Sequence, residues 1–425
     1  MNYVASNYVN VRVKFGVKNG DKSANMTTHK FIKFPPNFRE VGSRIWLLLG
    51  EIQARIEHIK RLPIPPDDSN MLRSMYLTKG VHSTTAIEGN SFSEEEVARI
   101  INKEMEAPPS RAYQEKQIEN MVEAFSMVGK NLIDGESSRF SVELLHRYHE
   151  LVLKGLEESI SEEVVIGKFR SHRVIVGRYL AAPPDEVPSL MKQYCDWLND
   201  KPIGTQGYKV AEQIVKAIAA HVYFTWIHPY GDGNGRMSRL VEFAILVGAG
   251  VPDIAAHLLS NFYNDTRDMY YRELQRSHGE SQDGSYPEEA RLNGFLEYAL
   301  QGFKDELDKQ FMLIHALQIE TIWHDVIHAE FRKRYSENLT QTQQRRKRLV
   351  LDLTDHRFEN PVRKGEIPDI TAALARAYRD KTERTIQRDL NALVDMDLLK
   401  KDDKGYKPNT DILMGLFARS RENDE

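Results

Sequence analysis

The sequence predicts a mostly helical protein with one short β-hairpin and a separate helical domain near its C-terminus. Apolar residues recur every three or four positions along most of the chain, whereas alternation with a period of two is scarce. A polar stretch at 335–344 then separates a long helical pattern from a more basic one. With 425 residues, of which 41% are hydrophobic, the chain is long enough to form two or three domains with cores of their own.

Helices are expected in the first 340 residues wherever the helical spacing of apolar residues persists. They are predicted at 44–62, 112–128, 141–157, 189–199, 208–226, 239–248, 265–276 and 293–334. The clearest extended segment is 173–176, Arg-Val-Ile-Val, which ends at Gly177 and is followed by Arg178-Tyr179-Leu180. This pattern predicts a short β-hairpin within the helical domain.

The C-terminal domain is expected to contain three helices and a hairpin. Helical patterns at 345–353, 367–378 and 382–396 precede a lysine-rich hairpin pattern at 398–407, which is the order of a winged helix.

The third of these helices resembles the recognition helix of DeoR-type winged helices. One of its faces is apolar, and the opposite face carries Arg384, Gln387 and Arg388. The range 341–410 holds 16 Lys/Arg against 12 Asp/Glu, while 1–340 holds 40 against 46. DNA is therefore a candidate partner of this domain, and contact with another protein is the alternative because the charge excess is modest.

The composition excludes several classes of protein. No apolar run approaches the ~18 residues that a membrane-spanning helix needs, so no membrane partner is expected. No secretory signal is visible at the N-terminus, and the single cysteine, Cys195, cannot form an internal disulfide. These features predict a cytoplasmic location. The net charge of −4 is too balanced to indicate a nucleic-acid binder by bulk charge.

The most informative stretch runs from His228 to Arg239 and reads His-Pro-Tyr-Gly-Asp-Gly-Asn-Gly-Arg-Met-Ser-Arg. Its glycines let backbone N–H groups turn inward into an anion-binding nest, and the helix that follows presents its positive end to the same point. Arg236 and Arg239 lie three residues apart and can reach one face. Asp232 can hold a Mg²⁺ that bridges phosphates, and His228 can act as a general base. The stretch therefore predicts a nucleotide phosphate site with a proton acceptor beside it.

Simpler interpretations of this loop fit less well. A tight turn does not need two arginines at this spacing. No Gly-Lys-Ser/Thr follows, so it is not a Walker loop, and a single carboxylate cannot supply the ligands of an EF-hand.

The loop closely resembles the signature of the Fic family, His-Pro-Phe-x-(Asp/Glu)-Gly-Asn-Gly-Arg-x-x-Arg. It departs from that signature at Tyr230, where Phe is usual and where an aromatic ring should still pack inward. The resemblance extends over about residues 30–335 and includes Gly-Lys-Phe-Arg at 167–170 and the turn at 181–184. It implies an all-α Fic fold, with the hairpin at 173–178 as a flap that aligns a target chain by strand addition.

The resemblance also implies a reaction, the transfer of AMP from ATP to a hydroxyl side chain (Ser, Thr or Tyr) of a target protein. His228 would deprotonate the hydroxyl, and Asp232 would coordinate Mg²⁺. The phosphates would be bound by Gly233, Asn234, Gly235, Arg236 and Arg239. In the Doc-like branch a lysine replaces the third glycine, so Gly235 favours adenylylation over phosphorylation.

A second motif, Thr-Thr-Ala-Ile-Glu-Gly-Asn at 84–90, lies between two helical segments. By itself it is a helix end with a Gly C-cap. It also resembles the family's inhibitory motif, (Ser/Thr)-x-x-x-Glu-(Gly/Asn), in which the glutamate pairs with the second arginine of the signature. This implies that Glu88 meets Arg239 where a γ-phosphate should bind, as in the class whose inhibition is intramolecular. In some relatives the same glutamate serves AMP removal.

Three further patterns have ordinary explanations. His324 and His328 imitate the zinc pattern His-Glu-x-x-His, but the acid between them is Asp and no third ligand is evident, so an ordinary helix is preferred. Cys195 is expected to be buried and unreactive. Tyr270 and Tyr271 resemble a tyrosine pair near the adenine in relatives, and core packing explains either ring equally well.

The predicted domains are an N-terminal region with the inhibitory helix (1–110), a Fic catalytic core (111–335), a winged-helix domain (341–410) and a tail (411–425). The predicted function is a protein adenylyltransferase that Glu88 inhibits. A deadenylylase of the same target and a nucleotide-sensing DNA-binding regulator are the alternatives. The expected partners are ATP with Mg²⁺ and a target protein, with DNA and a second copy of the chain as further candidates.

Overall fold

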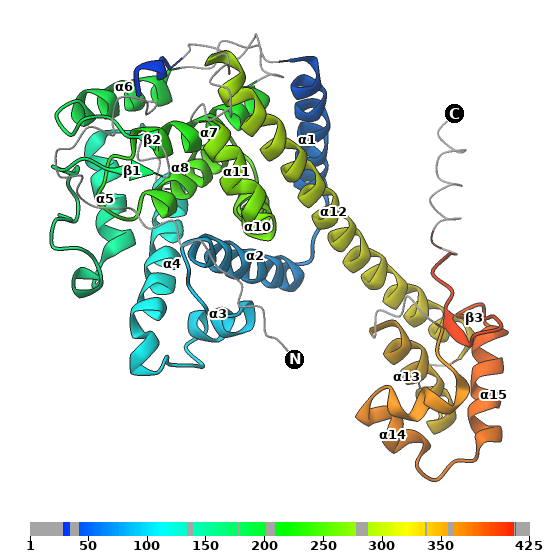
Figure 1. Ribbon diagram of the computed structural model, residues 1–425. Helices are drawn as coiled ribbons and strands as arrows, with labels where there is room; N and C mark the ends of the chain where they lie inside the picture. Colours follow the sequence, from blue (N-terminus) through cyan, green and yellow to red (C-terminus); the bar gives the residue numbers. More distant parts are fainter. Residues whose placement is uncertain are drawn as a thin grey trace, which may run out of the picture. The chain divides into compact units, whose positions relative to one another are not determined.

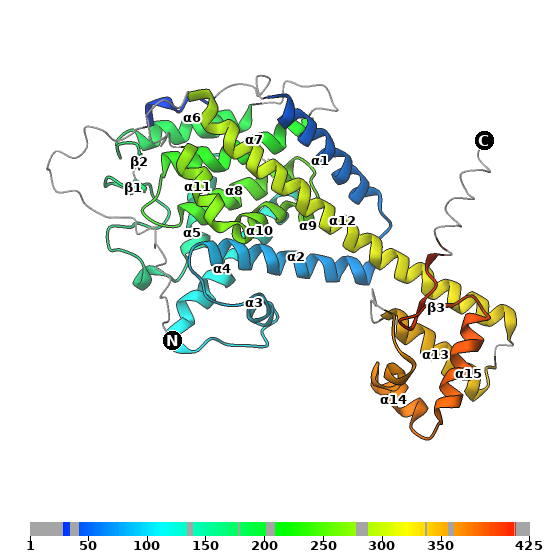
Figure 2. The same ribbon diagram turned by 45° about the vertical axis from the view of Figure 1, so that its right-hand side comes forward.

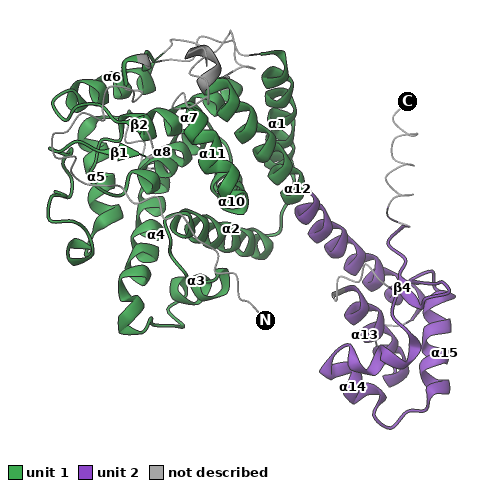
Figure 3. Cartoon of the chain, viewed as in Figure 1, with its two compact units in different colours: residues 1–311 green, residues 312–425 purple. Residues whose placement is uncertain are grey.

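The structure is a computed structural model that describes residues 29–34, 42–133, 139–176, 179–200, 209–277, 288–335, 338–355, 361–411 and 413. Within these residues the chain is mostly helical, with two small antiparallel strand pairs, as predicted. It divides into two compact units, Met1–Phe311 and Met312–Glu425 (Figure 3). In the described part of the chain, none of the helices combines the length and the hydrophobicity that crossing a bilayer requires.

The first unit is built from helices that surround a buried pair. Its helices are α1 (Ser43–Arg61), α2 (Pro66–Ile87), α3 (Glu94–Ile101), α4 (Ala112–Ile133), α5 (Val142–Leu153), α6 (Val187–Asn199), α7 (Lys209–Ile227), α8 (Asn234–Gly248), α9 (Asp253–Ala256), α10 (Leu258–Asp265) and α11 (Arg267–Ser277). Short 3₁₀ turns lie at His29–Phe31, Pro109–Arg111 and Glu157–Ser159. The long helix α12 (Glu288–Arg334) begins in this unit.

Helices α7 and α8 form the centre of the first unit (Figures 1 and 2). From Ile214 to Ile227 every side chain of α7 is buried, because this helix is apolar around most of its circumference. The loop that joins α7 to α8 carries the predicted phosphate site, so its two ends are fixed by the best-packed helices of the unit.

The helices predicted from the sequence are present, with ends that differ by a few residues. The extent of α2 was not predicted. Its buried face includes small and polar residues, so the apolar spacing that marks the other helices is weak there. Helix α2 packs along α10 and also contacts α3, α4 and α9.

The predicted hairpin is present in its described residues. Strands β1 (Ile175–Val176) and β2 (Tyr179–Leu180) pair antiparallel, with Ile175 opposite Leu180. Gly177 and Arg178 lie outside the described residues, as do residues 1–28 and most of 411–425.

The second unit contains α13 (Gln341–Asp355), a 3₁₀ turn (Lys364–Asp369), α14 (Ala372–Tyr378), α15 (Glu383–Val394) and the antiparallel strands β3 (Leu399–Lys401) and β4 (Tyr406–Pro408). Its core includes Trp323, Ile327 and Phe331 from the second half of α12. The division between the units therefore falls inside α12, earlier than the predicted 335–344, because this half of the helix buries its apolar face in the C-terminal core.

Candidate active site

The loop between α7 and α8 is closed by hydrogen bonds of its own. The amide side chain of Asn234 accepts from the N–H of Tyr230 at 2.9 Å and donates to its carbonyl at 2.8 Å. The loop is also bent by two residues in the left-handed region, His228 (φ 50°) and Gly233 (φ 76°). Asn234, which we predicted to bind phosphate, thus uses its side chain to shape the loop.

His149 of α5 holds this loop from the side. Its ring stacks on Tyr230, with centroids 3.8 Å apart, and Tyr230 is fully buried as predicted. Nδ1 of His149 accepts from the N–H of Gly167 at 2.9 Å, so Nε2 carries the proton and donates to the carbonyl of Asp232 at 3.1 Å. Burial lowers the pKa of His149 to about 4, which keeps this neutral form. This role of His149 has no signal in the sequence, because one sequence does not reveal a contact between distant segments.

Arg170 connects the hairpin to the same loop. Its guanidinium donates to four main-chain carbonyls, those of His172, Ala182, Ile227 and His228. Its own N–H donates to the carbonyl of Pro229 at 3.0 Å. Two of these carbonyls flank the hairpin and the other two lie at the end of α7. Arg170 therefore fixes the position of His228 relative to β2. Burial lowers the pKa of Arg170 to about 10, so it remains charged at neutral pH.

The His228 side chain is half-buried at the start of the loop. Burial, followed by the nearby charge of Arg170, lowers its pKa to about 4, so the ring is neutral at pH 7 and can accept a proton. Its Nδ1 is buried and has no hydrogen-bond partner within the described residues.

The first turn of α8 brings Arg236 and Asp232 together. Nη2 of Arg236 donates to Oδ1 of Asp232 at 3.1 Å, and the N–H of Gly233 donates to the same oxygen. Arg236 is only 4% exposed, yet its Nε and Nη1 are without a hydrogen-bond partner among the described residues. Buried N–H groups that lack an acceptor cost free energy, so an anion that accepted hydrogen bonds from this guanidinium would bind favourably.

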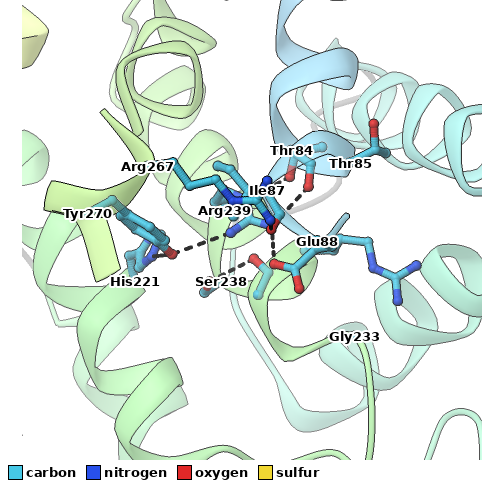
Figure 4. A network of polar contacts seen from close by, with 12 residues as sticks. Thr84, Thr85, Ile87, Glu88, His221, Gly233, Ser238, Arg239, Arg267 and Tyr270 are labelled. Atoms are coloured by element: carbon cyan, nitrogen blue, oxygen red, sulfur yellow. Dashed lines mark hydrogen bonds and ion pairs between the residues drawn. The ribbon is translucent and has the colours of Figure 1, made fainter. Parts of the chain in front are cut away.

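Arg239, one turn further along α8, forms an ion pair with Glu88 at the end of α2 (Figure 4). Oε1 of Glu88 lies 2.6 Å from Nη2 of Arg239, whose side chain is fully buried. Thr84 adds two acceptors, its Oγ1 at 2.8 Å from Nε and its carbonyl at 3.0 Å from Nη2. Burial raises the pKa of Glu88, but the charge and hydrogen bond of Arg239 outweigh this effect and lower it. Glu88 is therefore ionised in this site.

The end of α2 is held in a fixed conformation. Gly89 has φ 95°, and the N–H groups of Gly89 and Asn90 donate to the carbonyls of Ala86 and Thr85, which is a Schellman motif. From α11, Arg267 and Tyr271 both donate to the carbonyl of Ile87, at 2.6 and 2.9 Å. The Gly C-cap predicted from the sequence is confirmed. The two donors from α11 were not predicted.

Gly235 gives the Glu88 carboxylate its space. A Cβ atom at position 235 would overlap Oε1 of Glu88, so the absence of a side chain there allows the close approach. The carboxylate consequently lies against the N-terminal turn of α8, where the unpaired N–H groups of a helix favour negative charge.

The remaining candidates lie away from this site or within the core. Cys195 is 4% exposed, which confirms the expectation of a buried cysteine, and burial raises the pKa of its thiol to about 12. His324 and His328 lie on α12, and no group of three His, Cys, Asp or Glu side chains within the described residues is arranged to hold a metal ion. Tyr270 is fully buried beside Arg239, whereas Tyr271 is half-buried.

Residues 139–246 match the profile of the Fic/DOC family. This range contains α5, Arg170, the hairpin, α7 and the whole loop from His228 to Arg239. The matched range therefore contains every residue of the site except the segment at the end of α2 and the donors from α11.

Curated relatives are named protein adenylyltransferases. The chain is 29% identical over 204 residues to protein adenylyltransferase fic-1 of Caenorhabditis elegans, an alignment that covers 48% of this chain and 37% of that protein. It is 26% identical over 200 residues to protein adenylyltransferase Fic of Nematostella vectensis, covering 47% of this chain and 43% of that protein. The matched region thus spans less than half the length of these relatives.

Solved structures share the fold. A Fic family protein of Desulfovibrio desulfuricans aligns with a TM-score of 0.51 at 20% identity, covering 87% of this chain and 94% of that one. Residues 134–508 of Fic-1 of C. elegans align with a TM-score of 0.51 at 22% identity, covering 64% of this chain and 73% of that one. The predicted helical Fic fold is confirmed at this level.

Proposed function

We propose that the protein transfers AMP from ATP to a hydroxyl side chain of a target protein, and that Glu88 inhibits this transfer. The observation that carries the proposal is the pair of buried guanidinium groups on the first turns of α8. Arg236 keeps two N–H groups without an acceptor among the described residues, and Arg239 is charge-paired with a carboxylate. Two arginines at a helix N-terminus suit the phosphates of a nucleotide. The names of the curated relatives support adenylylation as the reaction.

The chemistry follows from the position of His228. Its neutral ring accepts the proton of the target hydroxyl, whose oxygen forms a bond to the α-phosphorus of ATP. The bond from that phosphorus to the bridging oxygen breaks, and pyrophosphate leaves with the electron pair. Arg236 and Arg239 bind the β- and γ-phosphates and so stabilise the charge that develops on the leaving group. The phosphates also raise the pKa of His228, because negative charge favours the imidazolium that forms.

Asp232 fits the Mg²⁺ that such a reaction uses. Both contacts that the described residues make with this carboxylate are to Oδ1, and 43% of the side chain is exposed. Magnesium in nucleotide sites is commonly held by one or two carboxylates, with substrate phosphates and waters completing its coordination. When bound, the ion would neutralise phosphate charge. The protein's part is to place Asp232 beside the first turn of α8.

Glu88 would inhibit by occupying the place of a phosphate. Its carboxylate is a smaller anion at the same guanidinium, and it fills the space beside Gly235. ATP that binds with its γ-phosphate displaced from Arg239 would not present its α-phosphate to the hydroxyl. Removal of AMP from the target is the alternative direction, because a third of the Glu88 side chain is exposed and could position a water.

The intact mass of the full chain after incubation with ATP and Mg²⁺ tests the reaction class. A gain of one AMP, about 329 Da from the formula of the transferred group, is expected for the Glu88→Gly variant and not for the Glu88→Gly/His228→Ala variant. A gain of a phosphoryl group, or no gain in a folded Glu88→Gly variant that is given ATP and a mixture of candidate targets, would contradict the proposal.

For the second unit we propose a winged helix that contacts DNA through α15. Arg384 and Arg388 are exposed on this helix, and Ile386 and Leu390 on its apolar face are buried. Gln387 is less available, because its amide donates to Asn391 and to the hydroxyl of Tyr406 on β4, each at 2.8 Å. The basic residues of α13 are also partly engaged.

The engaged residues of α13 are Arg345 and Arg346, which both donate to the buried carboxylate of Asp389. Their charge therefore stabilises the core of this unit rather than a nucleic-acid surface. The DNA contact is proposed for the exposed arginines of α15 alone.

A further inference from the structure

Arg239 has partners of two kinds, which differ in whether they belong to α2. Three of its hydrogen bonds go to α2, two to Thr84 and one to Glu88. A fourth goes from Nη1 to the hydroxyl of Tyr270 on α11, at 3.4 Å. If Glu88 withdraws together with the end of α2, the contacts to Thr84 and Glu88 are lost together, and the contact to Tyr270 is the one that stays.

The Tyr270 hydroxyl is itself held by a buried chain of polar groups. It lies 3.0 Å from Nε2 of His221 on α7, and Nδ1 of His221 lies 3.3 Å from Oε2 of Glu242 on α8. The hydroxyl of Tyr263 on α10 donates to Oε1 of Glu242 at 2.9 Å. These four side chains are at most 2% exposed, and Figure 4 shows His221 and Tyr270 on the side of Arg239 away from Glu88.

The chemistry of these side chains decides which group donates in each hydrogen bond. A carboxylate only accepts hydrogen bonds, so Nδ1 of His221 donates to Glu242. The Tyr270 oxygen accepts from Nη1 of Arg239, so the hydroxyl proton of Tyr270 points to Nε2 of His221, which accepts it. The oxygen of Tyr270 is left with lone pairs, which face the N–H of Arg239. The carboxylate of Glu242 thus fixes, through His221, which way the Tyr270 hydroxyl points.

Building on the proposed function, we propose that Tyr270, oriented by His221 and Glu242, is a positioning residue that keeps Arg239 ready for the γ-phosphate of ATP once Glu88 has withdrawn. A long arginine side chain that has lost its partners must be ordered again when the ligand binds, and this ordering weakens affinity. Tyr270 is linked through His221 and Glu242 to the rigid pair α7 and α8, so its contact with Arg239 keeps the guanidinium ordered and removes that cost. Inhibition and nucleotide binding then use the same arginine in nearly the same orientation.

Packing alone is the competing explanation of Tyr270. Its ring stacks on that of Tyr263, with centroids 4.9 Å apart, and lies edge-on to that of Phe295, with centroids 6.2 Å apart. Tyr270→Phe keeps these ring contacts and removes only the hydroxyl, so it separates the two roles.

The test uses the full chain carrying Glu88→Gly, titrated with ATP and with AMP in the presence of Mg²⁺. Adding Tyr270→Phe is expected to weaken ATP binding about tenfold, since hydrogen bonds to charged groups have effects of this size, and to leave AMP binding within about twofold because AMP lacks the γ-phosphate. Tyr298→Phe is the matched control. Its hydroxyl bonds to Thr266 at 2.6 Å in the same aromatic cluster, and it is expected to change neither affinity.

His221→Gln provides a second test, because His221 acts on Arg239 only through Tyr270. We expect the same selective loss of ATP affinity, with a smaller fold-change than for Tyr270→Phe. Equal ATP binding with and without Tyr270→Phe and His221→Gln, in variants whose melting temperatures show them folded, would overturn the inference and leave the proposed function standing. A parallel loss of ATP and AMP binding would also overturn it, because it would indicate packing. If the Glu88→Gly parent does not bind ATP, the proposed function fails and the inference fails with it.

Discussion

Oε1 of Glu88 and Nη2 of Arg239 lie 2.6 Å apart, although 151 residues separate them in the sequence. The contact joins the end of α2 to the second turn of α8, and the carboxylate lies where Gly235 leaves room for it. Arg239 cannot bind this carboxylate and a phosphate at the same N–H group. Every prediction about regulation depends on this competition.

Glu88→Gly is expected to raise adenylylation about ten- to a hundredfold. A charge-assisted hydrogen bond is worth roughly 1.5–3 kcal/mol, and each ~1.4 kcal/mol corresponds to a factor of ten in rate. The measurement is the rate of incorporation of labelled AMP into the protein itself and into a target. Arg239→Ala added to Glu88→Gly is expected to abolish the gain, since the arginine is the group for which carboxylate and phosphate compete.

An unchanged rate in a folded Glu88→Gly variant would contradict the inhibitory role. AMP removal from a labelled target is measured separately as the control. If Glu88→Gly raises labelling only because removal has stopped, Glu88 serves the reverse reaction instead.

His228→Ala, made in the Glu88→Gly background, is expected to lower AMP transfer by about 10²–10⁴ and to leave ATP binding largely intact, because a general base contributes to the chemical step. The pH profile of kcat/KM provides a second measurement. This profile is measured on Glu88→Gly with His228 intact. The imidazole acts as a base only when neutral, and its pKa in the free protein is about 4, so kcat/KM should begin to fall only well below pH 6.5 as the pH is lowered. Burial and Arg170, which lower this pKa, remain in Glu88→Gly, while the negative charge of Glu88, which raises it, is gone. A limb centred near pH 6.5 would contradict the assignment.

The sequence could predict that the residues of the candidate phosphate site lie together, because they are contiguous. From His228 to Arg239 the glycines, the acid and the arginines lie within one loop and the first turns of one helix, so their proximity follows from local geometry. The pairing of Glu88 with Arg239 was predicted from the motif at 84–90. No periodicity or spacing places α2 against α8.

What the sequence did not predict depends on contacts between distant segments. The four carbonyls bound by Arg170 and the two atoms bridged by His149 are main-chain groups, which have no signature in the sequence. Asn234 was assigned to phosphate because it lies in the loop, whereas its amide is used to close that loop. The extent of α2 was missed because small residues let it pack closely without an apolar stripe.

Arg267→Ala is expected to raise self-labelling by a few-fold, less than Glu88→Gly does. Arg267 donates to the carbonyl of Ile87 at 2.6 Å, and this contact keeps the last turn of α2 in place beside Arg239. Loss of a hydrogen bond from a charged donor costs about 1–3 kcal/mol, part of which Tyr271 retains through its own bond to the same carbonyl. Arg272→Ala, an exposed residue on the same helix, is the control.

The double variant Arg267→Ala/Glu88→Gly distinguishes this role from nucleotide binding. With Glu88 absent, loosening the end of α2 should bring no further gain. A fall in labelling there would place Arg267 on the nucleotide, and an unchanged rate in the single variant would show that Tyr271 and Thr84 suffice to hold α2.

Arg384→Ala and Arg388→Ala are each expected to weaken binding of the full chain to duplex DNA, and to reduce the slope of log K against log salt by about one, because each arginine that neutralises a phosphate releases counterions. Mobility shifts at several salt concentrations measure this, with AMP transfer unaffected. Arg363→Ala, on the strand-like segment beside β4, serves as a basic control outside α15. Absence of any shift at low salt would favour contact with protein.

Gly80→Ala is expected to displace α2 and thereby release Glu88. A Cβ at position 80 would overlap the ring of His257, which has little freedom to move. That ring stacks on Phe243 with centroids 4.5 Å apart, meets Phe125 edge-on at 4.8 Å and is 5% exposed. Overpacking of this kind costs about 1–3 kcal/mol, so the melting temperature should fall. Because Glu88 ends the same helix, self-labelling with AMP should rise.

The matched control for that substitution is Gly129→Ala in α4, where a Cβ would meet nothing within 4 Å, and where the better helix propensity of alanine should leave the melting temperature unchanged or slightly higher. His257→Ala added to Gly80→Ala makes room for the new methyl group, so α2 can return and the extra self-labelling should disappear. If Gly80→Ala keeps the parental melting temperature and the parental rate, the ring of His257 yields to the methyl group and does not set the position of α2. If self-labelling rises in Gly80→Ala and stays raised after His257→Ala is added, α2 is displaced through a contact other than the one with His257.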